Sequence, residues 1–172
     1  MKSEVYSLKK IVTIIGDSET SNEKELKFAE KLGEKLAEKG YIILTGGRGG
    51  IMEAVSRGAK KVGGITVAIL PSTDKKEANP YIDIAIPTGI GWARNQIVVL
   101  SADVVIAIGG KSGTLSEIAY AWMYNKPIIA IRGFGGWSEK VSGLRIDDRR
   151  KDIILPASSI DEVLAILESL SI

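Results

Sequence analysis

The stretch AIGGKSGTLSE, residues 107–117, decides the fold class of this chain, since it reads as the end of an apolar strand, a glycine turn and the start of a helix. The strand is expected over Val104–Ile108 and the helix over Ser112–Tyr124. Glycines let backbone N–H groups approach an anion, and a helix N-terminus adds roughly half a positive charge. This order of elements is typical of a turn that binds phosphate.

The same order of strand, turn and helix recurs along the chain. Further strands are expected over Ile11–Ile15, Tyr41–Leu44, Ile65–Leu70, Ile82–Ile86 and Pro127–Ile131, with a short seventh over Ile153–Leu155. Helices are expected from Thr20–Glu23 to Gly40, over Ile51–Ala59 and Gly91–Ala102, and from Ser159 onward. Apolar strands that do not alternate, each followed by an amphipathic helix, predict a parallel sheet covered on both faces. We therefore expect an α/β fold, a Rossmann-like three-layer sandwich with about seven mainly parallel strands.

Composition limits the classes of protein to which the chain can belong. At 172 residues with 45% hydrophobic content, we expect a single nucleotide-binding domain over residues 1–172. A net charge of +2 with 26% charged residues favours neither nucleic acid nor a membrane surface as a partner. No segment has the roughly eighteen consecutive apolar residues of a membrane span, and residues 1–5 lack the apolar region of a signal peptide. We therefore expect a soluble, cytoplasmic protein.

The chain contains neither cysteine nor histidine, which excludes whole classes of chemistry. Disulfides, thiolate ligands, Ser/His/Asp triads and Cys/His pairs are all ruled out. Any reaction must rely on carboxylates, Arg, Lys, Tyr, hydroxyls or backbone dipoles.

Glycine-rich loops follow three of the expected strands, at residues 16–18, 45–50 and 109–113. Parallel sheets bind ligands at the carboxyl ends of their strands, where these loops would meet. A Walker A loop would require glycine at Val105, and a dinucleotide fingerprint would require it at Met52. One such loop alone would read as a tight strand-to-helix turn, but two on one sheet edge favour phosphate binding.

Two isolated charges stand in otherwise apolar helices. Arg94 is the only charged residue between positions 83 and 103, and Glu117 is the only one between positions 111 and 126. Isolated charges in apolar helices point to function; a structural ion pair between the two is the alternative, and the two interpretations are compatible with each other. Thr114–Glu117 also fits a helix capping box, as do the helix starts at Thr20 and Ser159.

The three tryptophans, Trp92, Trp122 and Trp137, have two interpretations. Each offers a ring that can stack a nucleobase, but most tryptophans lie in a core or an interface.

Together these residues make the chain resemble the LONELY GUY family of nucleoside 5′-monophosphate phosphoribohydrolases, whose members have often been labelled lysine decarboxylases. The resemblance rests on Gly16-Asp17-Ser18, on GGRGGIM at 46–52, on Arg94 and on GGKSGTLSE at 109–117. The last motif is similar to the family signature Pro-Gly-Gly-x-Gly-Thr-x-x-Glu. The chain departs from the family pattern at three positions, with Ile108 in place of Pro, Asn95 in place of Lys and Ala93 in place of Glu.

The resemblance implies hydrolysis of an N-glycosidic bond, giving a free base and ribose 5-phosphate. Arg94 and Glu117 would be the catalytic pair, the carboxylate stabilising an oxocarbenium-like state. The residues implied in phosphate and nucleotide binding are Gly16, Ser18, Gly46, Gly47, Arg48, Gly49, Gly110, Lys111, Ser112, Gly113 and Thr114. The reaction would need no metal and no cofactor, and lysine decarboxylase activity is not expected because no lysine is placed convincingly for a pyridoxal Schiff base.

A second reading comes from another class of protein. The chain also resembles molybdenum cofactor carrier proteins, which hold a phosphorylated pterin on the same scaffold without cleaving it. A non-catalytic nucleotide-binding module is a third reading. The family resemblance further implies a homodimer or a larger homo-oligomer, with a small-molecule nucleotide or pterin bound near the contact between subunits.

Overall fold

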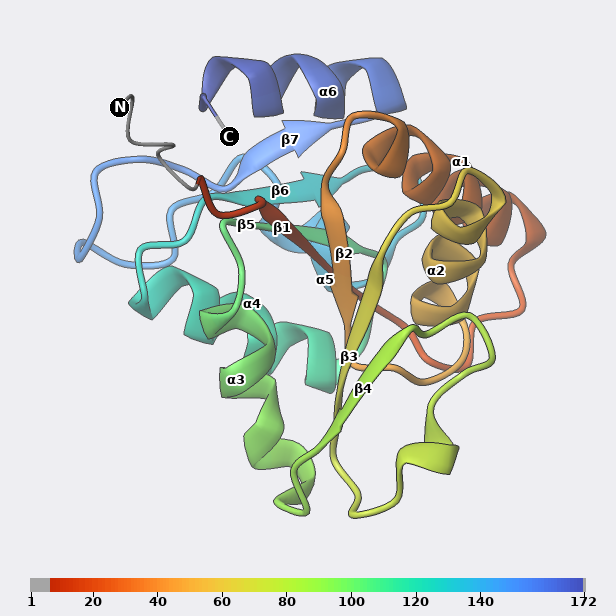
Figure 1. Cartoon of the computed structure of the whole chain (residues 1–172). Helices are drawn as coiled ribbons and strands as arrows, with labels where there is room; N and C mark the ends of the chain where they lie inside the picture. Colours follow the sequence, from red (N-terminus) through yellow and green to blue (C-terminus); the bar gives the residue numbers. More distant parts are fainter. Residues whose placement is uncertain (1–6, 172) are drawn as a thin grey trace, which may run out of the picture.

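Seven parallel strands form one sheet in the order β4-β3-β2-β1-β5-β6-β7 (Figure 1). The computed structural model describes residues 7–171, so the N-terminal residues behind the expectation of no signal peptide lie outside the described part. The strands are β1 (Ile11–Gly16), β2 (Ile42–Thr45), β3 (Thr66–Leu70), β4 (Ile84–Pro87), β5 (Val104–Ile108), β6 (Ile128–Ile131) and β7 (Leu155–Ala157). The predicted Rossmann-like α/β fold is confirmed.

Helices cover both faces of this sheet (Figure 1). They are α1 (Glu23–Glu38), α2 (Ile51–Lys61), α3 (Arg94–Leu100), α4 (Ser112–Met123), α5 (Gly136–Val141) and α6 (Ile160–Ser169), with short 3₁₀ turns η1 (Lys75–Glu77) and η2 (Gly91–Ala93). Helices α1, α2 and α6 pack on one face, and α3, α4 and α5 pack on the other. No helix within residues 7–171 is long and apolar enough to cross a membrane.

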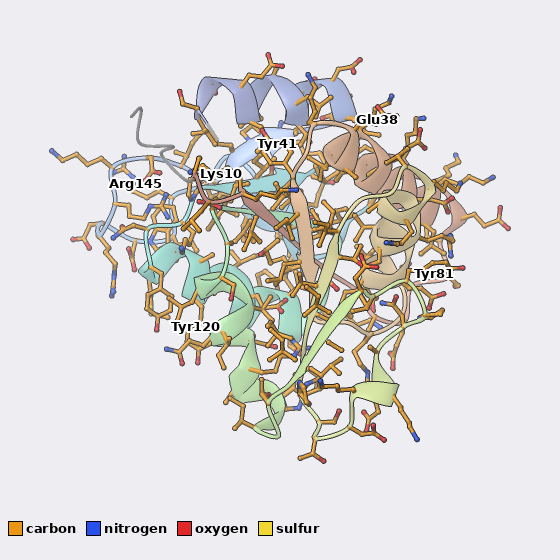
Figure 2. All side chains as sticks on the ribbon, viewed as in Figure 1. Lys10, Glu38, Tyr41, Tyr81, Tyr120 and Arg145 are labelled. Atoms are coloured by element: carbon orange, nitrogen blue, oxygen red, sulfur yellow. The ribbon has the colours of Figure 1, made fainter. Side chains whose placement is uncertain are left out.

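The strand sequences explain this layering. Every residue of β5 and β6 is buried, because these central strands are covered on both faces and consist of Val, Ile and Ala. In β4, at the edge of the sheet, Ile84 and Ile86 are exposed and alternate with half-buried neighbours. Charged residues such as Lys10, Glu38 and Arg145 are exposed, and Figure 2 shows Arg145 at the outer edge of the molecule.

The helix starts differ in part from the expected capping boxes. Helix α1 is capped by Asn22, whose side chain accepts from the N–H groups of Lys24 and Glu25, so the expected cap at Thr20 is wrong. The Thr20 hydroxyl instead donates to Glu25, 2.6 Å away. The expected cap at Ser159 is confirmed, because its side chain accepts from the N–H of Glu162.

Several elements also differ from expectation in their bounds, among them β4, which covers Ile84–Pro87 instead of residues 82–86. Strand β7 begins at Leu155 rather than Ile153. Its position is set by its pairing with Ile129–Ile131 of β6 and not by the hydrophobicity of the local sequence. The expected helix over 91–102 divides into the 3₁₀ turn η2 and the shorter α3. The short helix α5 was not predicted, because its glycine-rich start gives no helix signal.

The order of the strands creates a crevice at the carboxyl edge of the sheet. Strand β1 lies between β2 and β5. The chain leaves β1 for α1 on one face and leaves β5 for α4 on the other, so the loops after these two strands diverge. Such a topological switch point is where ligands bind in open α/β sheets.

Candidate functional site

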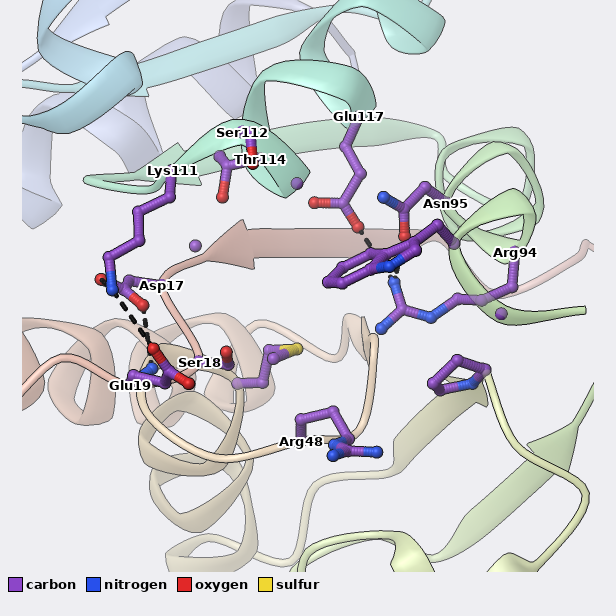
Figure 3. A pocket seen from close by; sticks show the side chains of 16 residues that line it. Asp17, Ser18, Glu19, Arg48, Arg94, Asn95, Lys111, Ser112, Thr114 and Glu117 are labelled. Carbon is purple, nitrogen blue, oxygen red and sulfur yellow. Dashed lines mark hydrogen bonds and ion pairs between the residues drawn. The ribbon is translucent and has the colours of Figure 1, made fainter.

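A cavity of about 530 Å³ opens at this switch point (Figure 3). It lies between the loops after β1, β2 and β5 and the start of α3. Its lining residues are Gly16, Asp17, Ser18, Glu19, Arg48, Met52, Pro71, Gly91, Trp92, Arg94, Asn95, Lys111, Ser112, Gly113, Thr114 and Glu117. Most of the residues singled out in the sequence therefore meet in one place. Four of them, Gly46, Gly47, Gly49 and Gly110, do not line it.

Two of these glycines make room for side chains that do line the cavity. A Cβ at Gly46 would lie 2.6 Å from Nη2 of Arg94. Gly110 has φ +95°, and a Cβ there would lie 2.4 Å from Oγ1 of Thr114. Both positions therefore require glycine for packing rather than for direct contact with a ligand.

The other two glycines shape the loop after β2. Gly47, with φ +76°, faces the sheet, where a Cβ would lie 2.6 Å from Ala68. Gly49 approaches the carbonyl of Ser18 in the loop after β1, which would lie 3.1 Å from a Cβ. The loops after β1 and β2 are thus packed together, and this fixes one wall of the cavity.

The N-terminus of α4 faces the cavity with free backbone donors. Its first helical hydrogen bond runs from the N–H of Leu115 to the carbonyl of Lys111, at 3.0 Å. The N–H groups of residues 112–114 come before that bond, so the helix supplies no acceptor for them. Together with the helix dipole, they form a site suited to an anion.

Lys111, the N-cap residue of α4, directs its side chain across the cavity mouth to the loop after β1 (Figure 3). Its Nζ lies 3.2 Å from Oδ2 of Asp17 and 3.4 Å from Oε2 of Glu19. Hydrogen bonds to these carboxylates, that of Asp17 first, raise the pKa of Lys111. The ammonium group is therefore already matched by two negative charges and ties the two loops together.

Arg94 and Glu117 form a buried ion pair between α3 and α4, on the opposite side of the cavity from Lys111 (Figure 3). Nη1 of Arg94 lies 3.4 Å from Oε1 of Glu117, and each residue is 6% exposed. The interpretation as an ion pair is confirmed. The capping-box interpretation of Glu117 is wrong, because Lys111 is the N-cap and the Glu117 carboxylate turns toward α3.

Burial controls the protonation of this pair. It raises the pKa of Glu117 to about 7, although the nearby Arg94 charge opposes the rise. Burial likewise lowers the pKa of Arg94, with Glu117 opposing, but a guanidinium stays charged at neutral pH. Among the described residues, Nε of Arg94 is the one buried side-chain nitrogen or oxygen without a hydrogen-bond partner. At neutral pH the Glu117 carboxyl therefore exists in both protonation states.

Asn95 connects this pair to the start of α4. Its Oδ1 accepts a hydrogen bond from Arg94, and its Nδ2 donates to Oγ of Ser116 at 2.9 Å. The Ser116 hydroxyl in turn donates to the carbonyl of Gly113 at 2.6 Å. The sequence marked Asn95 only as a departure from a family pattern. A lysine at this position has no acceptor and could not receive the bond from Arg94.

The three tryptophans have different surroundings. Trp122 is buried, and its Nε1 donates to Asp147 at 2.8 Å. Trp137 is partly buried, with the ammonium of Lys140 over its ring. Trp92 lines the cavity and is 79% exposed.

Sequence reasoning missed several residues of the cavity. Asp17 belonged to a quoted loop but received no role, and Glu19 carried no signal at all. Met52 belonged to a quoted motif and to an expected helix but received no role in the site, and Pro71 carried no signal for it. Within residues 7–171, no group of three or more His, Cys, Asp or Glu side chains is placed to hold a metal ion.

Comparison with solved structures finds carriers of the molybdenum cofactor. The molybdenum cofactor binding protein of Rippkaea orientalis superposes with a TM-score of 0.86 and 38% identity, over 97% of this chain and 100% of that one. The molybdenum cofactor carrier protein of Chlamydomonas reinhardtii gives a TM-score of 0.80 and 33% identity, over 95% and 99% of the two chains. The similarity therefore extends over nearly the whole chain.

Comparison of sequences adds a hydrolase. A cytokinin riboside 5′-monophosphate phosphoribohydrolase of Mycobacterium tuberculosis is 31% identical over 119 residues, which is 64% of this chain and 64% of that protein. The chain therefore aligns with less than two thirds of that relative. Both resemblances inferred from the motifs are confirmed. Because the SLOG cluster4 family matches residues 9–164, nearly all of the chain described by the structure, the protein belongs to the SLOG cluster4 family.

Proposed function

We propose that this protein binds a small phosphorylated ring compound in the switch-point cavity and holds it intact, as a carrier of a phosphorylated pterin. The observation that carries the proposal is the N-terminus of α4, whose free N–H groups open into a cavity of about 530 Å³. That volume suits a ligand of this size.

The phosphate would bind to the N–H groups of residues 112–114 and to the hydroxyl of Thr114. Ser18 and Arg48 line the cavity from the loops after β1 and β2 and would face the same ligand. Lys111 is already paired with Asp17 and Glu19, so its part would be to hold the two loops together around the ligand rather than to supply unpaired charge. All these contacts recognise a phosphate ester, and none of them requires a metal ion.

Two features favour holding over cleaving. The Glu117 carboxylate lines the cavity but is largely buried and paired with Arg94, which leaves it less free to act on a sugar. The positions of Ala93 and Asn95 also lack the Glu and Lys that flank the arginine in the hydrolase pattern. The similarity to carrier proteins along the full chain supports the same conclusion.

Hydrolysis of a nucleoside 5′-monophosphate is the second candidate, and the Arg94–Glu117 pair favours it. A carboxyl with a pKa of about 7 can exchange a proton at neutral pH. In this reaction water adds to the anomeric carbon, the N-glycosidic bond breaks, and the base leaves with a proton. Glu117 would stabilise the positive charge on the sugar.

Two measurements on the purified chain distinguish these functions. Native mass spectrometry detects any ligand retained during purification, and incubation with AMP, CMP, GMP and UMP tests for ribose 5-phosphate. The carrier proposal predicts a retained phosphorylated pterin and no ribose 5-phosphate. Formation of ribose 5-phosphate that is lost in Arg94→Ala and Glu117→Ala, but kept in the exposed control Glu38→Ala, would establish hydrolysis instead.

The protein is also proposed to form a homodimer through the outer face of α3 and the end of α4. Four apolar side chains are partly exposed there: Ile97, Leu100, Met123 and Tyr124. The two helices also carry Arg94 and Glu117, so a second copy on this face would lie close to the cavity. An exposed group of this kind is typical of a protein contact.

A further inference from the structure

Trp92 is the one aromatic residue among the described residues that line the cavity, and neither candidate function so far gives it a role. It lies in η2, directly before α3, and 79% of it is accessible to solvent. A tryptophan exposed to this degree leaves a large apolar surface in water. Other exposed apolar residues nearby, such as Ile86 and Ile90, do not line the cavity, whereas Trp92 does.

The indole lies beside the proposed phosphate site. Its Cζ3 atom lies 3.5 Å from the position that a Cβ would take on Gly113, in the first turn of α4. The ring edge therefore lies beside the turn whose N–H groups face the cavity, and a side chain at position 113 would contact it. Met52 and Pro71 line the same cavity and add apolar surface to it.

We propose that Trp92 is the stacking platform for a planar ring of the ligand, so that the cavity selects phosphorylated aromatic heterocycles over sugar phosphates of equal charge. The inference rests on the proposed function, because it places the phosphate at the start of α4. Aromatic rings stack on tryptophan whatever their hydrogen-bonding pattern, so Trp92 selects for a flat ring and not for one particular base.

The size of this selection follows from stacking. Removing the aromatic partner of a stacked base weakens binding by roughly 5- to 150-fold. AMP and ribose 5-phosphate provide a matched pair of probes, since they share the ribose and the phosphate and differ in the adenine ring. The ratio of their affinities therefore measures the effect of exchanging the anomeric hydroxyl of ribose 5-phosphate for the adenine ring.

The test is calorimetric titration of both probes into the wild-type chain and into Trp92→Ala, Trp92→Phe and the control Trp137→Phe. We expect the wild-type chain and Trp137→Phe to prefer AMP by roughly 5- to 150-fold. Trp92→Ala should reduce that ratio to near one through weaker AMP binding, with ribose 5-phosphate binding unchanged. Trp92→Phe should keep part of the preference, and AMP should quench the tryptophan fluorescence of Trp137→Phe.

Other outcomes overturn the proposal. An unchanged ratio in Trp92→Ala means that the indole does not contact the ring, and an equal loss for both probes means that it only supports the fold. Loss of a dimer with an unchanged ratio makes Trp92 an interface residue.

Failure of the carrier function can be distinguished from failure of the stacking proposal. A retained AMP preference without any bound pterin contradicts only the carrier function, whereas no binding of either probe to the wild-type chain overturns both proposals.

Discussion

At the scale of single residues, the buried Glu117 carboxyl links the cavity to the pH of its surroundings. Burial raises its pKa from 4.5 to about 7, so the folded chain holds this proton more tightly than the unfolded chain does. The stabilisation from this group is complete below about pH 4.5 and is lost as the pH rises through about 7. The contribution of Glu117 to the free energy of unfolding should therefore decrease as the pH rises from about 4.5 through about 7.

Replacing Glu117 by Gln tests this linkage, because the amide has a similar shape and cannot ionise. Removing the partner of the buried Arg94 charge costs stability at every pH, but between pH 5 and 8 we expect the free energy of unfolding of the wild-type chain to fall relative to that of Glu117→Gln, by roughly 3 kcal/mol at most. Urea denaturation at several pH values measures the difference. The partly exposed Glu53→Gln serves as a control and should follow the wild-type curve, and parallel curves for Glu117→Gln and wild type would contradict the burial argument.

At the scale of elements, the short helix α5 holds the glycine-rich loop after β5 through hydrogen bonds to Gly109. The buried Ser138 hydroxyl accepts from the N–H of Gly109 at 2.8 Å and donates to the carbonyl of Ile131 at 2.7 Å. The N–H of Ser138 also donates to the carbonyl of Gly109, at 2.9 Å. The loop before α4 thus depends on a helix that comes later in the chain.

Removing the Ser138 hydroxyl should loosen this loop. Ser138→Ala leaves the buried N–H of Gly109 without its acceptor, which costs about 1–3 kcal/mol of stability. Urea denaturation checks the value, and binding of ribose 5-phosphate should weaken as well. Ser101→Ala, which removes an exposed hydroxyl bonded to a backbone carbonyl, is the matched control and should change neither quantity. Equal effects of the two variants would show that Ser138 has no special part in holding the loop.

The elements also show how far the sequence predicts the structure. Strands such as β5 and β6 are predictable because buried parallel strands are continuous runs of Val, Ile and Ala. The Arg94–Glu117 pair is predictable because a charge buried among apolar residues is strongly destabilising unless an opposite charge lies beside it. The cap at Asn22 was missed because Thr20 offers an equally good local signal, and only the three-dimensional contact between Thr20 and Glu25 settles the choice.

The remaining parts of the site arise from contacts between loops that are far apart in sequence. Lys111 meets Asp17 and Glu19 only because β1 and β5 are neighbours in the sheet. Asn95 reaches Ser116 because α3 packs beside α4. Local sequence patterns do not contain such pairings, so only the general location of the site was predictable.

At the scale of the whole molecule, the sheet brings three loops to one edge, and exposed apolar side chains of α3 and the end of α4 form the face proposed above as the dimer contact. Leu100→Glu places a charge in that face and should shift a dimer to monomer in sedimentation velocity experiments. The control Leu144→Glu changes another exposed leucine, in the loop before β7, and should leave the dimer intact. A wild-type chain that sediments as a monomer at all concentrations tested would contradict the proposed contact.

Both the carrier function and the stacking by Trp92 depend on phosphate binding at the start of α4. A crystal structure of the chain with AMP tests this directly. We predict a phosphate oxygen within hydrogen-bond distance of the N–H groups of Ser112, Gly113 and Thr114, with the rest of the nucleotide inside the switch-point cavity. A phosphate bound elsewhere, for instance to the basic loop at residues 145–151, with these N–H groups facing only water, would contradict it.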